Sequence, residues 1–243
     1  VSYRYGASTE VLRNLYMNID LKESISVIGK VGSGKSTLLK LVCAEIKPTG
    51  GTVQVEFDNG VIANLWHVNI YKRYRHCVGY MPQEAYLSNT SFAINISLDA
   101  NGKDADVMAA IRLAELSADM GQWQDGLCEE IGETGVNLSG GQKQRVNLAR
   151  ALYSGRRFLV LDDPLSAVDT ETEGRLMENL LSHTDGFLLA SHRLAELGRT
   201  HRLIVMDAGR IIEDGDPNVL MKDPDSELSQ HLSADEFSLE EAS

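Results

Sequence analysis

The segment Gly29–Ser36 constrains the fold of this chain more than any other, because its letters, GKVGSGKS, fit the pattern GxxxxGK[ST]. It follows the short apolar run Ser24–Ile28, which is typical of a strand, and it leads into Ser36–Ala44, which is expected to be helical. In that context, backbone N–H groups of the loop and of the helix N-terminus surround phosphate groups. The sequence therefore predicts a phosphate-binding loop between a strand and a helix.

Two side chains of this loop are predicted to act on a nucleotide. Lys35 is expected to reach the β- and γ-phosphates, and the Ser36 hydroxyl is expected to ligate Mg²⁺. The alternative, a glycine-rich turn that binds nothing, is disfavoured by the strand and the helix around the loop. The predicted nucleotide-binding residues here are Gly29, Lys30, Val31, Gly32, Ser33, Gly34, Lys35, Ser36 and Thr37.

A second apolar run, Phe158–Leu161, is predicted to be a buried strand that ends in two carboxylates. In a protein with a phosphate loop, an aspartate at the position of Asp162 holds the Mg²⁺ shell, directly or through water. Asp163 follows, where a carboxylate could orient or deprotonate an attacking water. For an isolated motif, a surface acid at a strand end is an equal alternative, and the upstream loop argues against it.

Strands that alternate with helices indicate an α/β fold with a mainly parallel sheet. A helix is expected at Gly140–Tyr153, which carries the apolar residues Val146, Leu148, Ala149 and Leu152. Residues 1–28 are expected to be mainly strand, because their apolar residues recur at two-residue spacing. The other expected strands are Val1–Tyr5, Val11–Leu21, Thr52–Phe57, Val78–Tyr80, Phe187–Ala190 and Leu203–Met206.

The chain is expected to divide into a core and an insertion. Residues 1–83 and about 136–222 form the expected ATP-binding core, and residues from about 84 to 135 are expected to be a mainly helical insertion, since Asp104–Met120 has near-helical apolar spacing. Residues 223–243 are expected to be an acidic tail, solvated or partly disordered.

Composition excludes several classes of protein. The formal net charge of −12 disfavours a nucleic-acid binder that is basic overall, and no window approaches 18 uninterrupted apolar residues, so the chain is not expected to span a membrane by itself. Cys43, Cys77 and Cys128 lack metal-binding spacing and are expected to be free thiols in a reducing compartment.

The pentapeptide Leu138–Gln142, LSGGQ, lies between the phosphate loop and the acidic strand. Together the three motifs resemble the nucleotide-binding domain of ATP-binding cassette (ABC) transporters, over nearly the whole chain. The resemblance implies a P-loop NTPase core, an N-terminal antiparallel β region and an inserted helical subdomain. It also implies ATP and Mg²⁺ as cofactors, ATP hydrolysis coupled to transmembrane transport, and no nucleic-acid partner.

Each further motif of the family has a match in order. Tyr5 matches the aromatic residue that stacks on adenine, with Tyr3 as the rival on the same face. Gln83 matches the glutamine that also reaches Mg²⁺, and His192 matches the switch histidine; with Lys35 and Asp163 they complete the catalytic set that the resemblance implies. The signature match is Leu138, Ser139, Gly140, Gly141 and Gln142, and the D-loop match is Ser166, Ala167, Val168 and Asp169.

The resemblance implies a head-to-tail pair of domains. ATP would lie between the phosphate loop of one domain and the signature loop of the other. Binding would close the pair, and hydrolysis would reopen it and drive transmembrane domains of the same or an associated chain. The expected location is the cytoplasmic side of the cell membrane. Independently, a serine hydroxyl and two glycine amides at a helix N-terminus, as in Ser139–Gly141, form a second anion site.

The branch of the family is indicated by three segments. Glu130–Gly135 resembles the X-loop of exporters, whereas Asn137–Tyr153 and Asp162–Asp169 resemble the first nucleotide-binding domain of the multidrug-resistance-associated subfamily. Such exporters often fuse the cassette behind six transmembrane helices, so a chain that begins at Val1 without Met is expected to be part of a longer polypeptide. A soluble ABC-type ATPase of DNA repair or translation and a regulatory nucleotide-binding module stay open as alternatives.

One residue departs from the most active family pattern. Asp163 stands where the catalytic glutamate is expected, and its carboxylate would sit roughly 1–1.5 Å back from the water position. Misplacement of that order costs about a hundredfold in rate. The chain's own site is therefore expected to bind ATP and hydrolyse it slowly. Because the signature is intact, a heterodimer with a partner that carries Glu at this position is favoured over a homodimer.

Overall fold

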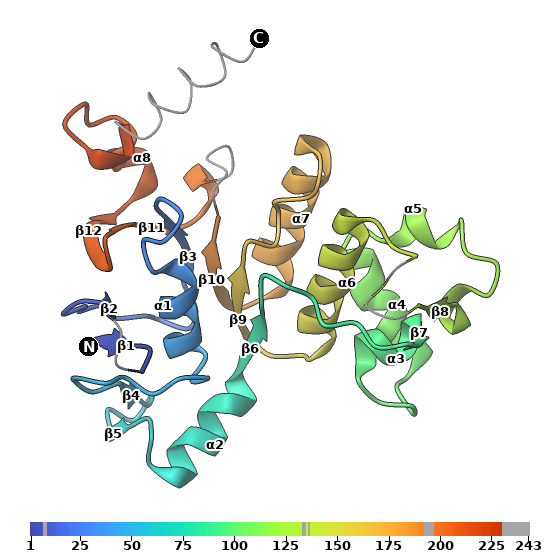
Figure 1. The fold of residues 1–243 in the computed structure, drawn as a ribbon, viewed down its shortest axis with the longest axis horizontal. Helices are drawn as coiled ribbons and strands as arrows, with labels where there is room; N and C mark the ends of the chain where they lie inside the picture. Colours follow the sequence, from blue (N-terminus) through green and yellow to red (C-terminus); the bar gives the residue numbers. More distant parts are fainter. Residues whose placement is uncertain (7–8, 133–134, 136, 192–196, 230–243) are drawn as a thin grey trace.

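The computed structural model describes residues 1–6, 9–132, 135, 137–191 and 197–229. Across these residues the largest sheet has six strands in the order β12-β11-β3-β10-β9-β6 (Figure 1). Neighbouring strands run parallel, except that β12 is antiparallel at one edge. The strands are β3 (Ser24–Ile28), β6 (Val78–Met81), β9 (Phe158–Asp162), β10 (Gly186–Ala190), β11 (Arg202–Asp207) and β12 (Arg210–Gly215).

Helices cover both faces of this sheet. Helix α1 (Lys35–Val42) packs on one face, and α6 (Gly140–Tyr153) and α7 (Thr170–His183) pack on the other (Figure 1). Side chains alternate between the two buried clusters along each strand: Phe158 and Val160 face α1, whereas Leu159 and Leu161 face α6 and α7. Burial on both faces explains why the central strands read as continuous apolar runs.

The expected helical insertion contains mostly short helices, which lie beyond α6 from the sheet (Figure 1). These are α3 (Phe92–Ser97), α4 (Asp104–Leu113), α5 (Ser117–Met120) and a 3₁₀ turn at Gly126–Cys128, with strands β7 (Thr90–Ser91) and β8 (Glu130–Ile131) paired antiparallel. Helical spacing over Asp104–Met120 is broken at Glu115, whose φ of 55° ends α4. One buried cluster runs from α3 and α4 through α6 to the sheet.

The N-terminal region forms small antiparallel pairs rather than the long strands expected over residues 1–28. β1 (Tyr3–Arg4) pairs with β2 (Glu10–Leu12), and β4 (Gln54–Glu56) pairs with β5 (Ile62–Asn64). The strand expected at Val11–Leu21 is wrong beyond Leu12, because Asn14 has a φ of 50° and turns the chain. The apolar residues after this turn still pack against the α1 cluster.

The remaining helices are α2 (Val68–Cys77), a 3₁₀ turn at Leu197–Arg199 and α8 (Pro217–Leu220). The α/β class, the mainly parallel sheet and the N-terminal antiparallel region are as expected from the sequence. The helix at Gly140–Tyr153 is confirmed at both ends. Within the described ranges, none of the helices has the length and apolar character needed to cross a membrane.

Because helices cover both faces of the sheet, truncating a side chain at its centre is expected to lower the free energy of unfolding strongly. Phe158 of β9 is fully buried, so Phe158→Ala is expected to lower the free energy of unfolding by about 3–5 kcal/mol, through lost burial and a residual cavity. Tyr16→Ala is the control, since that side chain is 85% exposed and the change is expected to stay within about 0.5 kcal/mol. Urea unfolding measures the free energy of unfolding of both variants. A similar loss in Phe158→Ala and Tyr16→Ala would contradict the assigned core.

Candidate nucleotide-binding site

The parallel strands bring the predicted site residues to one edge of the sheet. Val27 of β3, Ala190 of β10 and Asp162 of β9 lie side by side in one row. The phosphate loop leaves β3 just beyond this row, and Gln83 is exposed on the loop that leaves β6. In open α/β sheets, ligands bind at the carboxyl ends of the strands. The edge at Asp162 is therefore the candidate site.

Glycine is required where the phosphate loop meets its supports. Gly29 has a φ of 148°, and a Cβ atom there would lie 2.1 Å from the carbonyl oxygen of Met206. Gly34 has a φ of 105° directly before α1, and a Cβ there would lie 2.8 Å from the Leu12 side chain. The loop thus has a left-handed backbone packed closely on β11 and β2, with the α1 N-terminus behind it. Backbone N–H groups of such a loop and of the helix N-terminus can donate hydrogen bonds to an anion there.

Lys35 is held inside the loop. Its side chain is buried, and its Nζ donates to the carbonyl oxygens of Gly29 (2.6 Å) and Lys30 (3.2 Å). Burial lowers the pKa of Lys35, and the nearby carboxylates of Asp162 and Asp163 oppose that shift. The ammonium group therefore lies between loop carbonyls and the acidic strand end, where phosphate oxygens would be stronger acceptors than the carbonyls.

Asp162 fits the role of a Mg²⁺ ligand. Burial raises the pKa of Asp162, and a hydrogen bond from Ser36 lowers it. A hydroxyl and a carboxylate in contact match the way Mg²⁺ binds, through one or two protein oxygens together with substrate phosphates. Over the described residues there is no group of three or more His, Cys, Asp or Glu that could hold a metal ion.

Asp163 lies in a constrained turn, and one of its carboxylate oxygens has no hydrogen-bond partner among the described residues. Its φ is 54°, and its backbone N–H donates to the Ala190 carbonyl (2.9 Å). The side chain is 9% exposed, and its Oδ1 has no hydrogen-bond partner among the described residues. The same holds for Oγ of Ser33 in the phosphate loop. Both atoms belong to residues at the candidate site, where a nucleotide and its water would supply hydrogen-bond partners.

Tyr5 lies beside the helix that follows the phosphate loop. Its hydroxyl is 3.4 Å from Oγ1 of Thr37, and its ring contacts Tyr3 edge-on at 4.9 Å between centroids. Tyr5 is 44% exposed, whereas Tyr3 packs against the buried α1 cluster. Tyr5 is therefore the more exposed of the two rings, and its stacking on adenine stays a prediction.

The signature residues lie at the start of α6, and some of them make hydrogen bonds within the chain. Oγ of Ser139 accepts from the Gln142 N–H (3.2 Å), and Oε1 of Gln142 accepts from the Ser139 N–H (2.8 Å), which is a capping box. Nε2 of Gln142 donates to Asp119 (2.9 Å), so both ends of this amide bind within the chain. Leu138 is buried. Ser139 and Gly140 are exposed, and Gly141 is half-buried.

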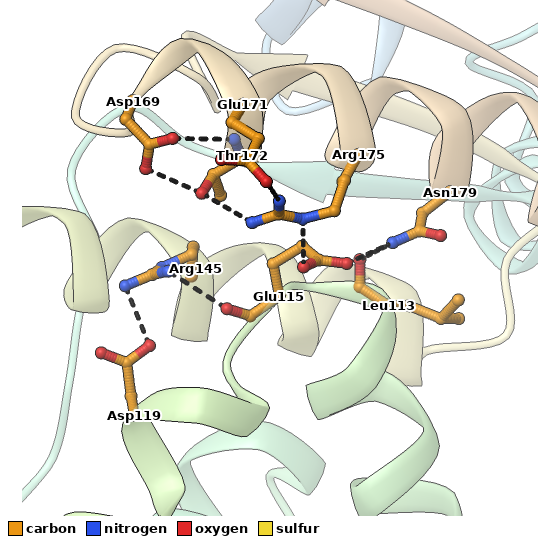
Figure 2. Close-up of polar contacts among 9 residues, drawn as sticks. All are labelled: Leu113, Glu115, Asp119, Arg145, Asp169, Glu171, Thr172, Arg175 and Asn179. Atoms are coloured by element: carbon orange, nitrogen blue, oxygen red, sulfur yellow. Dashed lines mark hydrogen bonds and ion pairs between the residues drawn. The ribbon is translucent and has the colours of Figure 1, made fainter.

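Glu115 joins three helices next to the signature (Figure 2). Its carboxylate accepts from Arg175 (2.9 Å) and Asn179 (3.1 Å) of α7, and its backbone carbonyl accepts from Arg145 of α6 (3.1 Å). Arg145 also pairs with Asp119 at 3.0 Å. This network fixes the insertion against α6 and α7.

The D-loop residues precede α7, and Asp169 caps this helix. Its carboxylate accepts from the backbone N–H and the hydroxyl of Thr172, at 2.9 and 2.7 Å (Figure 2). These bonds lower the pKa of Asp169 to about 2. Ser166 and Ala167 are exposed and Val168 is buried. The loop from Asp163 to Ala167 is hydrogen-bonded to Gln144 of α6.

Some predicted residues lie outside the described part of the chain, and two residues that hold the surroundings of the site together were missed. His192 and two residues of the expected X-loop, Glu133 and Thr134, belong to the first group, as does most of the acidic tail. Sequence reasoning missed Glu115 and Gln144. Their partners are distant in the sequence, so the only available signal was the place of Gln144 just after the LSGGQ motif.

Comparisons with known proteins agree on one family. The family profile described as "ABC transporter" matches residues 12–166. A lactococcin-A transport/processing ATP-binding protein of Lactococcus lactis is 36% identical over 217 residues, which are 88% of this chain and 30% of that protein. A multidrug resistance protein of Leishmania tarentolae is also 36% identical over 217 residues, which are 88% of this chain and 13% of that protein.

A solved structure shows the same fold. It is a bacterial Atm1-family ABC exporter with ATP bound, and it superposes with a TM-score of 0.86 at 28% sequence identity. The match covers 97% of this chain and 40% of that one. This chain thus spans less than half of the solved relative, as it spans 30% of the lactococcin-A relative.

The raised pKa of Asp162 predicts opposite effects with and without nucleotide. A folded-state pKa above the unfolded value means that the ionised carboxylate costs stability, and this cost is complete once the pH exceeds the folded-state pKa. Asp162→Asn is therefore expected to unfold at the same or a higher temperature than wild type at pH 7 without nucleotide. With Mg-ATP at a hundred times its Kd, wild type gains about 2.7 kcal/mol, and the variant is expected to lose most of that gain.

The control for this change is Asp58→Asn, which removes an exposed carboxylate away from the site. It is expected to keep the full Mg-ATP stabilisation. Thermal unfolding with and without Mg-ATP compares the three proteins. An equal Mg-ATP stabilisation in wild type and Asp162→Asn would rule out Asp162 as a metal-site residue.

Proposed function

The chain belongs to the ABC transporter family, and we propose that it is the ATP-binding and hydrolysing domain of an exporter. ATP-binding domains of this family are ATPases coupled to transport. The observation that carries the proposal is the meeting of Lys35, Asp162 and Asp163 at the carboxyl edge of the sheet, with a signature loop exposed at the start of α6. Relatives whose names specify export or multidrug resistance support the exporter branch.

The proposed hydrolysis begins with binding at the phosphate loop. Backbone N–H groups and Lys35 hold the phosphates, and Tyr5 stacks on the adenine. Ser36, Asp162 and Gln83 hold Mg²⁺, which neutralises charge on the phosphate oxygens when bound. Asp163 then orients the attacking water through its Oδ1, which has no partner among the described residues, and accepts a proton from it. His192, by resemblance to the switch histidine, contacts the γ-phosphate.

The proposed partner is a second nucleotide-binding domain, packed head to tail. Ser139 and Gly140 are exposed and Gly141 is half-buried at the N-terminus of a 14-residue helix, where N–H groups and the helix dipole favour an anion. The phosphate of a nucleotide on the partner's loop would fill that place. Transmembrane domains are proposed to attach through the insertion, with the whole assembly at the cytoplasmic face of a membrane.

Asp163 supports a slow site paired with a faster one. The αL turn fixes its backbone, so the short side chain cannot move forward to the water position of a glutamate. A heterodimer whose other domain carries Glu at this position is therefore proposed. Aspartate in place of glutamate at position 163 also favours the second candidate function, a regulatory module that binds ATP with little turnover.

Removing the Lys35 ammonium tests the proposal directly. Lys35→Ala is expected to abolish ATP binding at micromolar nucleotide, because the loop loses its only predicted cationic contact to the β- and γ-phosphates. Fluorescent-nucleotide titration measures binding, and phosphate release at saturating Mg-ATP measures turnover. Lys47→Ala removes an exposed lysine just beyond α1 and is expected to bind and turn over like wild type.

Two results would contradict the ATPase proposal. One is undiminished nucleotide binding by Lys35→Ala, and the other is the absence of Lys35-dependent phosphate release from the wild-type chain. A turnover per chain that rises with protein concentration is the result expected for a paired site. A constant turnover per chain would contradict a head-to-tail pair of two copies of this chain.

The length of the Asp163 side chain predicts an unusual gain of function. Asp163→Glu is expected to raise turnover between about tenfold and a hundredfold, because the longer side chain reaches the water. Asp163→Asn, which keeps the length and removes the base, is expected to lower it. Steady-state phosphate release compares the three proteins. An unchanged or lower rate in folded Asp163→Glu would mean that aspartate is a competent base, and the argument for an unlike partner would fail.

A further inference from the structure

We propose that Gln144 is a positioning residue for hydrolysis: it fixes the backbone of Asp163 to the helix that carries the signature loop. The inference rests on the proposed function and deepens it, since it concerns the carboxylate assigned to the attacking water. Gln144 lies on α6, two residues beyond the signature. It belongs to none of the motifs described above.

The Gln144 amide binds three successive parts of the loop after β9. Its Nε2 donates to the Asp163 carbonyl (3.1 Å) and to Oγ of Ser166 (2.5 Å). Its Oε1 accepts from the backbone N–H of Ala167 (2.9 Å). Ser166 adds a second donor to the Asp163 carbonyl (3.3 Å). Gln144 thus holds the start and the end of this loop at once.

The position of the Asp163 carboxylate depends on that hold. With a φ of 54°, Asp163 occupies a conformation that non-glycine residues adopt at some cost and keep only when their surroundings fix it. On one side the Ala190 carbonyl receives its N–H, and on the other side Gln144 and Ser166 donate to its carbonyl. An aspartate side chain is short and cannot compensate for a shift of its backbone, so the carboxylate moves with the backbone.

A second contact shows that α6 and the loop are built to fit. A Cβ atom on Gly141 would lie 2.4 Å from the Ala167 carbonyl oxygen. Gly141 and Gln144 are three residues apart, so they share one face of α6. The glycine lets the helix approach the loop, and the glutamine binds it. The surface that meets a partner's nucleotide is therefore coupled through one rigid helix to the carboxylate of the chain's own site.

The decisive variant is Gln144→Glu. It keeps the size of the side chain and an acceptor for the Ala167 N–H, but it removes the donor to the Asp163 carbonyl. We expect kcat to fall between about tenfold and a hundredfold, with KM for ATP within about twofold of wild type, since the phosphate loop is untouched. Gln54→Glu makes the same charge change at an exposed site on β4 and is expected to leave both constants unchanged.

Ser166→Ala provides a second test that still applies if Gln144→Glu does not fold. It removes the second donor to the same carbonyl with a smaller change, and it is expected to lower kcat less, again without a change in KM. Amide hydrogen exchange adds a readout that does not depend on turnover. Gln144→Leu is expected to speed exchange of the Ala167 amide at least tenfold, while amides in the middle of β9 exchange as in wild type.

The outcomes separate this inference from the proposed function. Phosphate release by wild type that does not depend on Lys35 would overturn the proposed function and this inference with it. Lys35-dependent release with an unchanged kcat in Gln144→Glu, or a fall in kcat matched by a rise in KM, would overturn the inference alone. So would unchanged exchange of the Ala167 amide in Gln144→Leu. A fall in kcat at constant KM, with faster Ala167 exchange, supports it.

Discussion

The site depends on burying charge at one edge of a parallel sheet. Lys35, Asp162 and Asp163 all have little exposure, and isolated buried charges are costly unless they are paired and hydrogen-bonded. Here loop carbonyls receive the ammonium, a hydroxyl donates to one carboxylate, and opposite charges lie close together. The compensation is incomplete, because Oδ1 of Asp163 has no partner among the described residues. The fold thus maintains a site whose remaining polar groups suit a charged ligand.

Helix α6 connects this edge to the rest of the molecule. One of its faces packs on the sheet, and its N-terminus presents the signature. Gln144 reaches the loop after β9, while the neighbouring Arg145 reaches Asp119 and Glu115 in the insertion. Consecutive residues on one helix therefore bind the two regions that flank it. A displacement of the signature would be passed to the nucleotide edge and to the insertion at the same time.

The sequence predicted what local chemistry determines and missed what distant contacts determine. Ser24–Ile28, Gly29–Ser36 and Gly140–Tyr153 carry strong local patterns, and the structure has the expected strand, loop and helix there. Helix α7 is an exception, because it was not assigned although Asp169 caps it and Leu176, Met177 and Leu180 have helical spacing, which are local signals. The break at Glu115 and the turn at Asn14 require a positive φ at ordinary residues, which no sequence pattern indicated.

The buried cluster shared by the insertion and the sheet sets a limit on how this domain can be rearranged. Phe92, Ile96 and Ile111 belong to the same apolar cluster as Leu159 and Leu189 of the central strands, with α6 between them. The insertion is therefore not a detachable module. A chimera that exchanges only residues 84–135 between relatives would join two halves of one interior that were never matched. Exchanges that carry α6 along would keep that interior matched on the insertion side, and they would move the signature loop with it.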